Sequence, residues 1–318
     1  MTYSPAYTLV PTYECFNRCT YCNFRVDPGQ DTWLTLAEAE VTLRSLRSNA
    51  HEPVIEILIL SGEVHPQSSR RIAWFERIYH LCDLALALGF LPHTNAGTLS
   101  WQEMERLKAV NVSMGLMLEQ LTPELRETVH RHAPNKAPEL RLQQLQWAGE
   151  LHIPFTTGLL LGIGESLTDR LETLNAIAKL HQQFGHIQEV ILQPYSPGHR
   201  EEWAGVGFSS AEFVELVAIA RQILPAEIVI QIPPNLMQNP HTLIASLEAG
   251  ARDLGGIGPW DEVNPDYPHP LHTELKTCLE EAGWKFVRRL PIYPQYDEWL
   301  PPALNQHVKQ WREQLNSH

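Results

Sequence analysis

Short apolar segments alternate with amphipathic helical patterns along almost the whole chain. This alternation constrains the fold strongly, because it is typical of a parallel sheet with helices packed on its faces. Segments with the length and apolar content of buried strands lie at 7–12, 55–60, 90–93, 112–118, 155–161, 189–193, 228–232 and 253–257. Eight such units predict an α/β fold with a (β/α)8 TIM-like barrel, or a partial barrel of six units with a C-terminal extension, and we favour the fuller barrel.

Helix start signals fall between the predicted strands. Three pairs have the spacing of a capping box: Thr35 with Glu38, Ser100 with Glu103, and Ser209 with Glu212. No linker-like stretch divides the chain, and 318 residues can bury one large core. We therefore expect a single domain over 1–318, with a core at about 5–235 and further C-terminal units at about 236–318.

The composition argues against several classes of function. A net charge of −13 disfavours a nucleic-acid or anionic-membrane partner. No apolar run reaches the roughly 18 residues of a membrane span, and the N-terminus lacks the basic and apolar regions of a secretory signal. Five cysteines, an odd number, do not form a disulfide framework. We therefore expect a reduced, cytoplasmic protein with neither a nucleic-acid nor a membrane partner.

Three cysteines follow the first predicted strand in the run ECFNRCTYCNF, at Cys15, Cys19 and Cys22. A cubane iron–sulfur cluster that only transfers electrons takes four thiolates, so the spacing C-x3-C-x2-C leaves one iron without a protein ligand. Catalytic metal sites keep such a position open for a substrate or cofactor. Cys82 and Cys278 lie in apolar helical patterns, where cysteine packs as a small hydrophobe, and we expect both in the core.

Zinc binding is the alternative interpretation of the three cysteines. Zinc fingers and ribbons place a second Cys or His pair about 12 to 20 residues further on. No such pair follows Cys22. The spacing therefore disfavours zinc, although a non-catalytic zinc-binding module is left as an alternative.

Polar residues and glycines follow the next predicted strands, where the loops of a barrel carry its reactive groups. Gly62 lets the backbone approach a ligand, and Glu63 offers a carboxylate near the cysteine loop. His93 and Asn95 close the third predicted strand and are expected to line the site. A solvated turn and a satisfied core histidine are the competing interpretations of these residues.

Two further strand ends offer groups for a nucleoside. Glu119 closes the fourth predicted strand, where a carboxylate can bind ribose hydroxyls, although it could also be an ordinary helix-start charge. Gly162 and Gly164 follow the fifth and permit the backbone to lie against an adenine or a ribose. The run GIGES lacks the G-x-G-x-x-G spacing of a dinucleotide site, and the chain has no P-loop and no G-x-S-x-G elbow.

The cysteine loop, with Tyr21 before its last cysteine and Gly62–Glu63 after the second predicted strand, resembles the radical S-adenosylmethionine (SAM) superfamily. The resemblance implies a TIM-like or partial radical SAM barrel. Further segments resemble the CofG-type subunits of 7,8-didemethyl-8-hydroxy-5-deazariboflavin (FO) synthase across almost the whole chain: TYSPAYTLVPTYECFNRCTYCNFR, SGEVHP, LPHTNAGTLS, MGLMLE, PFTTGLLLGIGE and GGIGPWDEVNPDYPHP. The cysteine motif points to the superfamily alone, and the other segments taken together point to this family.

The resemblance implies two cofactors and a set of residues that bind them. Cys15, Cys19 and Cys22 would ligate three irons of a [4Fe-4S] cluster, and the amine and carboxylate of SAM would chelate the fourth. Glu63 matches the position that helps to hold the methionyl amine. Glu119 and Arg141 match positions that contact the ribose and the carboxylate. Asn95 and Gly162 complete the cofactor-binding residues expected from the strand ends.

The same resemblance implies the reaction. Cleavage of SAM would give a 5′-deoxyadenosyl radical that takes hydrogen from an adduct of the tyrosine hydroxybenzyl group with a ribitylamino-uracil. Ring closure with loss of ammonia would yield FO, so the chain would be a carbon–nitrogen lyase. The sister subunit CofH would supply the adduct, and an external electron donor would reduce the cluster. Another radical SAM enzyme of this barrel type, such as a futalosine cyclase or a hydrogenase-maturase relative, is the nearer alternative.

Polar and aromatic residues near the later strand ends are available to line a substrate site. The substrate implied by the resemblance is a neutral polyol joined to a uracil and a phenol, which hydrogen-bonding groups and aromatic walls suit better than clustered charge. The expected lining residues are Gln193, Tyr195, Gln231, Asn235, Trp260, Asp261, Tyr293 and Tyr296.

Overall fold

Eight parallel strands close into a barrel in the computed structural model, which describes residues 1–48, 53–237 and 239–316. The barrel strands are β1 (Thr2–Leu9), β2 (Glu56–Leu60), β3 (Leu91–Asn95), β4 (Ser113–Gly115), β5 (Phe155–Leu161), β6 (Ile187–Pro194), β7 (Val229–Gln231) and β8 (Asp253–Ile257). Each strand pairs with the next, and β1 pairs with both β8 and β2, so the sheet has no open edge. The fuller barrel predicted from the sequence is confirmed.

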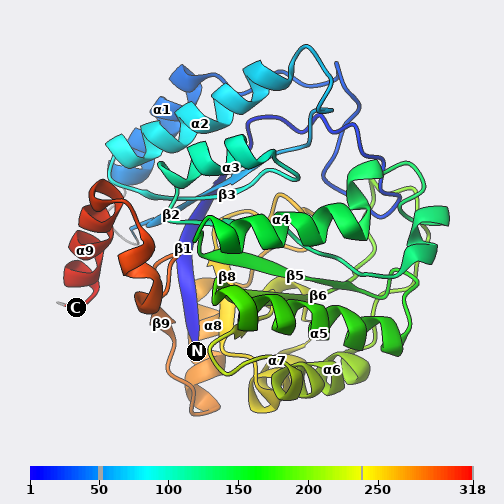
Figure 1. The fold of residues 1–318 in the computed structure, drawn as a ribbon. Helices are drawn as coiled ribbons and strands as arrows, with labels where there is room; N and C mark the ends of the chain where they lie inside the picture. The colour runs from blue at the N-terminus through cyan, green and yellow to red at the C-terminus, as the bar shows by residue number, and fades with distance from the viewer. Residues whose placement is uncertain (49–52, 238, 317–318) are drawn as a thin grey trace.

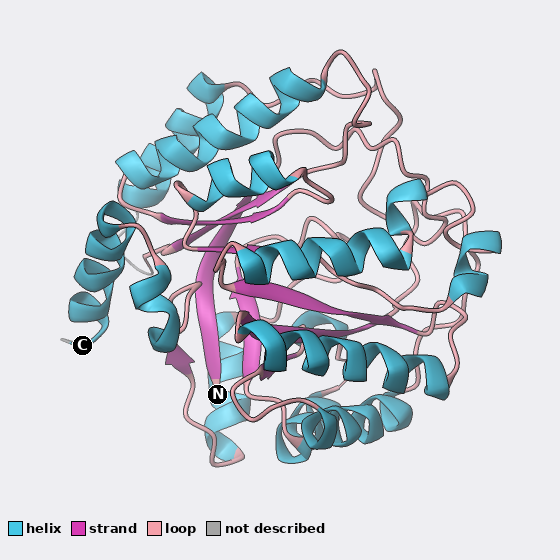
Figure 2. Cartoon of the chain, viewed as in Figure 1, coloured by secondary structure: helices cyan, strands magenta, loops and turns pink. Residues whose placement is uncertain are grey.

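Helices connect the strands and cover the outside of the barrel (Figures 1 and 2). They are α1 (Leu36–Ser48), α2 (Arg71–Ala87), α3 (Trp101–Lys108), α4 (Pro138–Glu150), α5 (Leu167–Phe184), α6 (Ser210–Ile223), α7 (Pro240–Ala249), α8 (His272–Glu281) and α9 (Pro302–Asn316). Short 3-10 turns lie at η1 (Pro123–Glu127), η2 (Pro134–Lys136), η3 (Pro234–Leu236) and η4 (Pro294–Trp299). No helix among the described residues is both long and apolar enough to cross a membrane.

The predicted capping boxes form at two of the three positions. Thr35 and Glu38 exchange hydrogen bonds before α1, and Ser100 caps α3 with Glu103. The prediction for Ser209 is wrong in detail, because its side chain makes no capping hydrogen bond although α6 begins at the next residue.

Two strands, β1 and β4, differ from the predicted bounds by more than two residues at an end. β1 begins at Thr2 rather than at residue 7, because Pro5 is accommodated within the strand and its carbonyl accepts a hydrogen bond from Ile55 N–H at 2.9 Å. β4 is confined to Ser113–Gly115, although the residues up to Glu119 still follow β5 through backbone hydrogen bonds. In both strands, the hydrogen bonds to the neighbouring strand determine where the strand begins and ends, and the apolar content of the segment does not.

The barrel lumen is hollow near its centre. Side chains alternate along β2, so Ile57 and Ile59 are fully buried in the core, whereas Glu56, Leu58 and Leu60 line the lumen. Large branched side chains fill most TIM barrels. Here several inward positions carry small residues, which are Ala6, Thr8, Gly115 and Gly256. The small residues leave a cavity that runs through the lumen.

A C-terminal segment closes the N-terminal end of the barrel. The short strand β9 (Val287–Arg288) pairs in parallel with the start of β1. The Pro291 carbonyl then accepts hydrogen bonds from Ser113 Oγ at 2.6 Å and Gln188 Nε2 at 3.1 Å, at the starts of β4 and β6. Helix α9 packs against the end of α2, where Trp311 Nε1 donates to the Gly89 carbonyl at 2.9 Å. The C-terminal extension is therefore the floor of the lumen.

Candidate active site

The three cysteines of the motif lie on one loop that leaves the C-terminal end of β1. A tight turn brings Cys22 N–H within 3.1 Å of the Cys19 carbonyl, and Cys15 N–H donates to the Val26 carbonyl at 3.1 Å. These bonds close the loop around the cysteines without regular secondary structure.

Glu14 anchors this loop from inside. Its carboxylate is 2% exposed, accepts hydrogen bonds from Gly29 N–H at 2.7 Å and Trp33 Nε1 at 3.1 Å, and pairs with Arg70 at 2.7 Å. Burial acts to raise the pKa of Glu14, but the hydrogen bonds from Trp33 and Gly29 outweigh it and the pKa is lowered. An ionised Glu14 therefore fixes the loop to the start of α2.

The far side of the cysteine loop is bonded to residues 129–135. Arg18 N–H donates to the His132 carbonyl at 2.8 Å, and Thr20 N–H donates to the Val129 carbonyl at 3.0 Å. The loop is thus held on both sides before any ligand binds, as a site that must keep three thiols in place requires.

Glu63 lies directly against the cysteine loop, as the sequence predicted. Its carbonyl accepts a hydrogen bond from Phe16 N–H at 3.0 Å. Its buried carboxylate accepts from Asn135 Nδ2 at 2.6 Å and Thr98 Oγ1 at 3.3 Å, and lies 3.6 Å from the Arg141 guanidinium. Glu63 therefore joins the cysteine loop, the end of β3 and the start of α4.

Two glycines make this close packing possible. A Cβ at Gly62 would lie 2.3 Å from the Glu14 carbonyl oxygen, so the close approach predicted for Gly62 is to the cysteine loop. Gly97 has a φ of +76°, and its Cβ would lie 2.1 Å from the carboxyl carbon of Glu63. Neither position accepts a side chain without moving Glu14 or Glu63.

Glu119 and Arg141 lie on the other side of the same site. Glu119 adopts a φ of +64°, which is uncommon for a residue with a Cβ, and its buried carboxylate pairs with Lys136. Arg141 is buried and donates to the carbonyls of Met117 and of Asn135, the latter at 2.9 Å. Backbone strain of this kind concentrates at functional sites.

The remaining two predicted cofactor residues lie apart from this cluster. Asn95 ends β3 and lines the lumen cavity. Gly162 has a φ of +90°, donates its N–H to Glu165 at 2.7 Å, and would place a Cβ 2.8 Å from the Phe208 ring. Gly162 does not line this cavity, and its contact with an adenosine stays a prediction.

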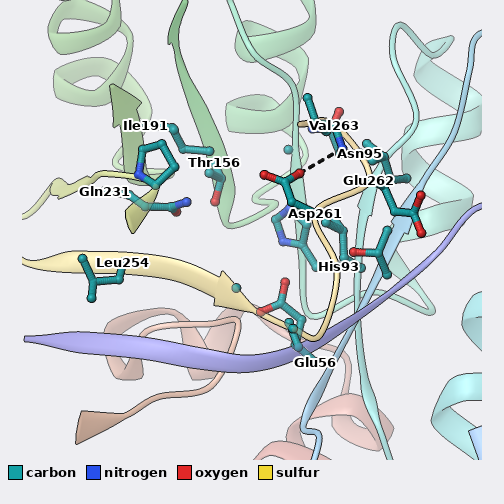
Figure 3. A pocket seen from close by; sticks show the side chains of 18 of the residues that line it. Glu56, His93, Asn95, Thr156, Ile191, Gln231, Leu254, Asp261, Glu262 and Val263 are labelled. Carbon is teal, nitrogen blue, oxygen red and sulfur yellow. Dashed lines mark hydrogen bonds between the residues drawn. The ribbon is translucent and has the colours of Figure 1, made fainter. Parts of the chain in front are cut away.

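Five of the eight expected substrate-lining residues line the cavity, namely Gln193, Gln231, Asn235, Trp260 and Asp261. Figure 3 shows Gln231 and Asp261 on its wall. Tyr195 does not line it, because it packs on Trp203 and donates to Glu201. Tyr293 and Tyr296 do not line it either, because they belong to the C-terminal segment and donate to Glu189 and to the Ile187 carbonyl.

Several site residues were not predicted from the sequence. Asn135 and Lys136 lie on η2, a three-residue turn without any periodic pattern, and their charge and amide look like loop polarity in the sequence. The contacts that the loop after β8 makes with other loops were also not predicted. Its Glu262 accepts a hydrogen bond from Tyr13 at 2.8 Å, and its Asp261 accepts one from Asn235 at 2.7 Å, so the loop bridges the cavity mouth and the cysteine loop.

The three thiols lie close enough for the charges of Cys15 and Cys22 to act on Cys19, and their binding of an iron–sulfur cluster with one open iron stays a prediction. Burial raises the pKa of Cys15 to about 11, with Glu63 adding to the effect, and burial raises that of Cys19 to about 12. Metal binding would displace those protons. Among the described residues no three Cys, His, Asp or Glu side chains converge on a single metal ion, whereas cubane ligands each bind a separate iron. Cys82 is buried in the core, as predicted. The same prediction is wrong for Cys278, which lies on α8 and is only partly buried, beside the core residues Leu275 and Leu279.

Comparison with known proteins defines the class. Residues 9–177 match the model of the radical SAM superfamily. The fold is similar to that of the FeFe-hydrogenase maturase HydG from Carboxydothermus hydrogenoformans, with a TM-score of 0.74 and 20% identity over 98% of this chain and 77% of that one. It is also similar to methylornithine synthase, with a TM-score of 0.67 and 15% identity over 90% and 83% of the two chains. The chain belongs to the radical SAM superfamily, whose cofactors are a [4Fe-4S] cluster and SAM.

Sequence relatives define the family within this superfamily. The chain is 65% identical to the 7,8-didemethyl-8-hydroxy-5-deazariboflavin synthase of Nostoc sp. over 98% of its own length and 91% of the relative's. It is 61% identical to the protein of the same name from Trichodesmium erythraeum, over 99% and 98% of the two chains. The chain belongs to the family of 7,8-didemethyl-8-hydroxy-5-deazariboflavin synthases. It is therefore an enzyme, and the zinc-module alternative is wrong.

Proposed function

We propose that the chain converts the hydroxybenzyl–ribityliminouracil adduct to FO with release of ammonia. The observation that carries this proposal is the 61–65% identity, over nearly the whole chain, to proteins named for that synthesis. The site agrees with it, because an anchored three-cysteine loop lies over a lumen cavity that can hold a small-molecule substrate.

Each predicted residue has a role that its position supports. Cys15, Cys19 and Cys22 hold the cluster, and Glu63, bonded to the cysteine loop through Phe16, holds the amine of SAM. Glu119 binds the ribose hydroxyls, helped by the strained backbone that aims its carboxylate.

Arg141 acts on the same site from the first turn of α4. Its position 3.6 Å from Glu63 supports a contact with the carboxylate of SAM, beside the amine that Glu63 holds. Asn95 contacts the nucleoside from the end of β3, and Gly162 lets the backbone pass beside it.

When bound and reduced, the cluster supplies the electron that cleaves SAM into methionine and a radical able to abstract hydrogen. The residues of the chain then confine the reaction. Asp261 and Glu262 of the loop after β8 line the cavity (Figure 3). Each is tied to another loop, because Asn235 donates to Asp261 and Tyr13 donates to Glu262. A covered mouth keeps water and stray hydrogen donors away from a reactive intermediate.

Two partners complete the proposed reaction. The sister subunit CofH supplies the adduct, and an external electron donor reduces the cluster. The presence of a single three-cysteine motif in this chain supports the division of labour, because making the adduct calls for a second radical reaction.

The experiment compares Cys19→Ala with Cys278→Ala. Each protein is reconstituted with iron and sulfide without oxygen and given dithionite, SAM and the adduct. We expect wild type and Cys278→Ala to bind the cluster and to form 5′-deoxyadenosine and fluorescent FO. Cys19→Ala should lose the cluster, 5′-deoxyadenosine and FO, because Cys19 lies on the cysteine loop. Cys278→Ala is the control, because Cys278 lies on α8.

Two results would contradict parts of the proposal. Formation of 5′-deoxyadenosine without FO would show that the radical chemistry is right and the substrate wrong. Equal cluster content in Cys19→Ala and wild type would remove Cys19 from the ligand set.

A further inference from the structure

The floor of the lumen carries polar side chains that the cofactor chemistry does not use. Glu56, His93, Thr156 and Glu189 line the same cavity that reaches Asp261 at the mouth. Figure 3 shows Glu56, His93 and Thr156 around this space, each on a different strand. The cavity therefore connects the cofactor end of the barrel to a built polar surface at the other end.

The charge of this surface is strongly asymmetric. Arg289 is the only Lys or Arg among the described residues that line the cavity. Its guanidinium is already engaged, since it donates to Asp253 at 2.6 and 2.7 Å and to Glu189 at 2.5 Å. Glu56 lines the same floor. The carboxyl groups of Glu56, Asp253 and Glu189 thus lie around the Arg289 guanidinium, whose N–H groups donate to Asp253 and Glu189.

His93 adds a hydrogen-bond acceptor. Ser113 Oγ donates to the Pro291 carbonyl at 2.6 Å, so it must accept its second bond, at 2.7 Å, from His93 Nδ1–H. That tautomer leaves His93 Nε2 as a bare acceptor beside Gly115 on the lumen wall. Burial, with the charge of Arg289, lowers the pKa of His93 to about 3, so the ring stays neutral.

Glu189 and Thr156 form a second polar pair on the floor. Thr156 Oγ1 donates to Glu189 Oε2 at 3.0 Å and accepts from Gln188 Nε2 at 3.3 Å, so one acceptor site of its hydroxyl is already used. Burial raises the pKa of Glu189 to about 7, where Asp253 adds to the rise and Arg289 opposes it. Burial likewise raises the pKa of Glu56. The floor is therefore rich in hydrogen-bond acceptors.

We propose that this floor is the subsite for the ribityl chain of the substrate, and that it selects the free polyol against its phosphate ester. The proposal rests on the function proposed above. The polyol takes no part in ring closure, so it is the part of the substrate that can lie far from the cluster. Its hydroxyl groups donate hydrogen bonds, which the acceptors Glu56, Glu189 and His93 Nε2 can receive.

A phosphate ester would lack hydrogen-bond donors at the same place. Phosphate sites in barrels of this type form at the C-terminal face, where helix N-termini supply N–H groups and a positive field. The floor is at the opposite end, and the described residues that line it offer acceptors rather than the N–H donors and positive charge that a phosphate needs. Arg289 cannot compensate, because its donors already bind Asp253 and Glu189.

The test measures binding of fluorescent FO and of its 5′-phosphate ester to the full chain with its reconstituted cluster. We expect wild type to bind FO at least about 10-fold more tightly than the ester, which is about 1.4 kcal/mol. Glu56→Gln should narrow this ratio at least threefold, because it places an amide that can donate to the ester where the carboxyl group stood. A deazaflavin with a methyl group in place of the ribityl chain should bind wild type more weakly than FO.

Controls separate the proposal from a general effect. Glu40→Gln removes an exposed carboxylate on α1 and should leave the ratio unchanged. His93→Asn should weaken the binding of FO more than the binding of the methyl analogue. It serves as the second variant if Glu56→Gln does not fold. Equal affinity of wild type for FO and its ester would overturn the floor subsite. A loaded enzyme that forms 5′-deoxyadenosine but neither binds nor forms FO would overturn the proposed function as well.

Discussion

Gly97 and Glu63 show how single residues set the geometry of the cofactor site. The Glu63 carboxylate occupies the volume that a side chain at Gly97 would need, and it is held there by Asn135 and Thr98. The same carboxylate is the group that we propose to bind the amine of SAM. A substitution at Gly97 therefore acts on catalysis through the position of Glu63.

Gly97→Ala should reduce formation of 5′-deoxyadenosine at least 10-fold, because the new Cβ would overlap Glu63. The matched control is Gly283→Ala, which has a similar φ of +80° but no atom within 4 Å of its Cβ. The control should cost about 1 kcal/mol of folding free energy from the backbone alone. Measured by urea unfolding and by product yield, equal losses in both variants would contradict the role of the Glu63 contact.

The buried His93 predicts how stability depends on pH. An unfolded histidine has a pKa near 6.5, whereas burial holds His93 at about 3 in the folded chain. Below pH 6.5 the unfolded chain binds a proton that the folded chain refuses, so stability is full above that pH and falls as pH drops. Between pH 6.5 and 5 this histidine should cost about 1–2 kcal/mol.

The measurement is chemical unfolding of wild type and His93→Asn at both pH values. Asparagine keeps a donor for Ser113 but does not titrate, so the variant should lose less stability on acidification. Parallel losses in the two proteins would show that His93 does not supply this pH dependence.

Some residues of the proposed site can be predicted from the sequence, and others cannot. Cys15, Cys19 and Cys22 follow from spacing alone, because three thiolates at that spacing have few other uses. Glu63, Glu119 and Arg141 needed the resemblance to a family. Lys136 could not be predicted, because it meets Glu119 only through the fold and sits on a turn without a pattern.

At the scale of elements, the segment around β9 closes the barrel through one buried arginine. Arg289 follows this two-residue strand and reaches Asp253 at the start of β8 and Glu189 on β6. Breaking a buried ion pair by removing one partner is strongly destabilising, because the other charge is left unpaired. The floor therefore depends on a residue far from the barrel strands in sequence.

Arg289→Met should lower the free energy of unfolding by about 3–5 kcal/mol. Arg44→Met is the matched control, because Arg44 is 65% exposed and pairs with Glu40 on the same helix. The control should change stability by at most about 0.5 kcal/mol. Denaturant unfolding of the two variants measures the difference, and a loss below 1 kcal/mol in Arg289→Met would contradict a closing role for the arginine.

A helix or strand could be predicted from the sequence when its own residues form a recognisable pattern. All eight barrel strands carry enough apolar residues to be recognised, and their alternation with helices predicts the closed barrel. β9 has only two residues, and its pairing with β1 spans almost the whole chain, so no local signal reveals it. Trp260 and Asp261 in the loop after β8 were expected to line the substrate site. The hydrogen bonds of this loop to Tyr13 and Asn235 could not be predicted, because they depend on tertiary structure.

At the scale of the whole molecule, we propose that residues 1–318 act as one domain. The core expected at about 5–235 holds seven of the strands, but β8 completes the barrel and the segment after β9 forms its floor. The C-terminal units therefore support the same cavity as the cysteine loop. In the arrangement that we propose, the cofactors and the ribityl chain lie at opposite ends of this cavity, with the reacting part of the substrate between them.

The most direct test of the proposed reaction is its stoichiometry. The anaerobic, reconstituted protein is given SAM, reductant and the adduct, and FO, ammonia and 5′-deoxyadenosine are measured in one time course. The account predicts FO and ammonia in equal amounts, with 5′-deoxyadenosine at least equal to both. Formation of 5′-deoxyadenosine and consumption of the adduct without release of ammonia would contradict it, because ring closure to FO requires that loss.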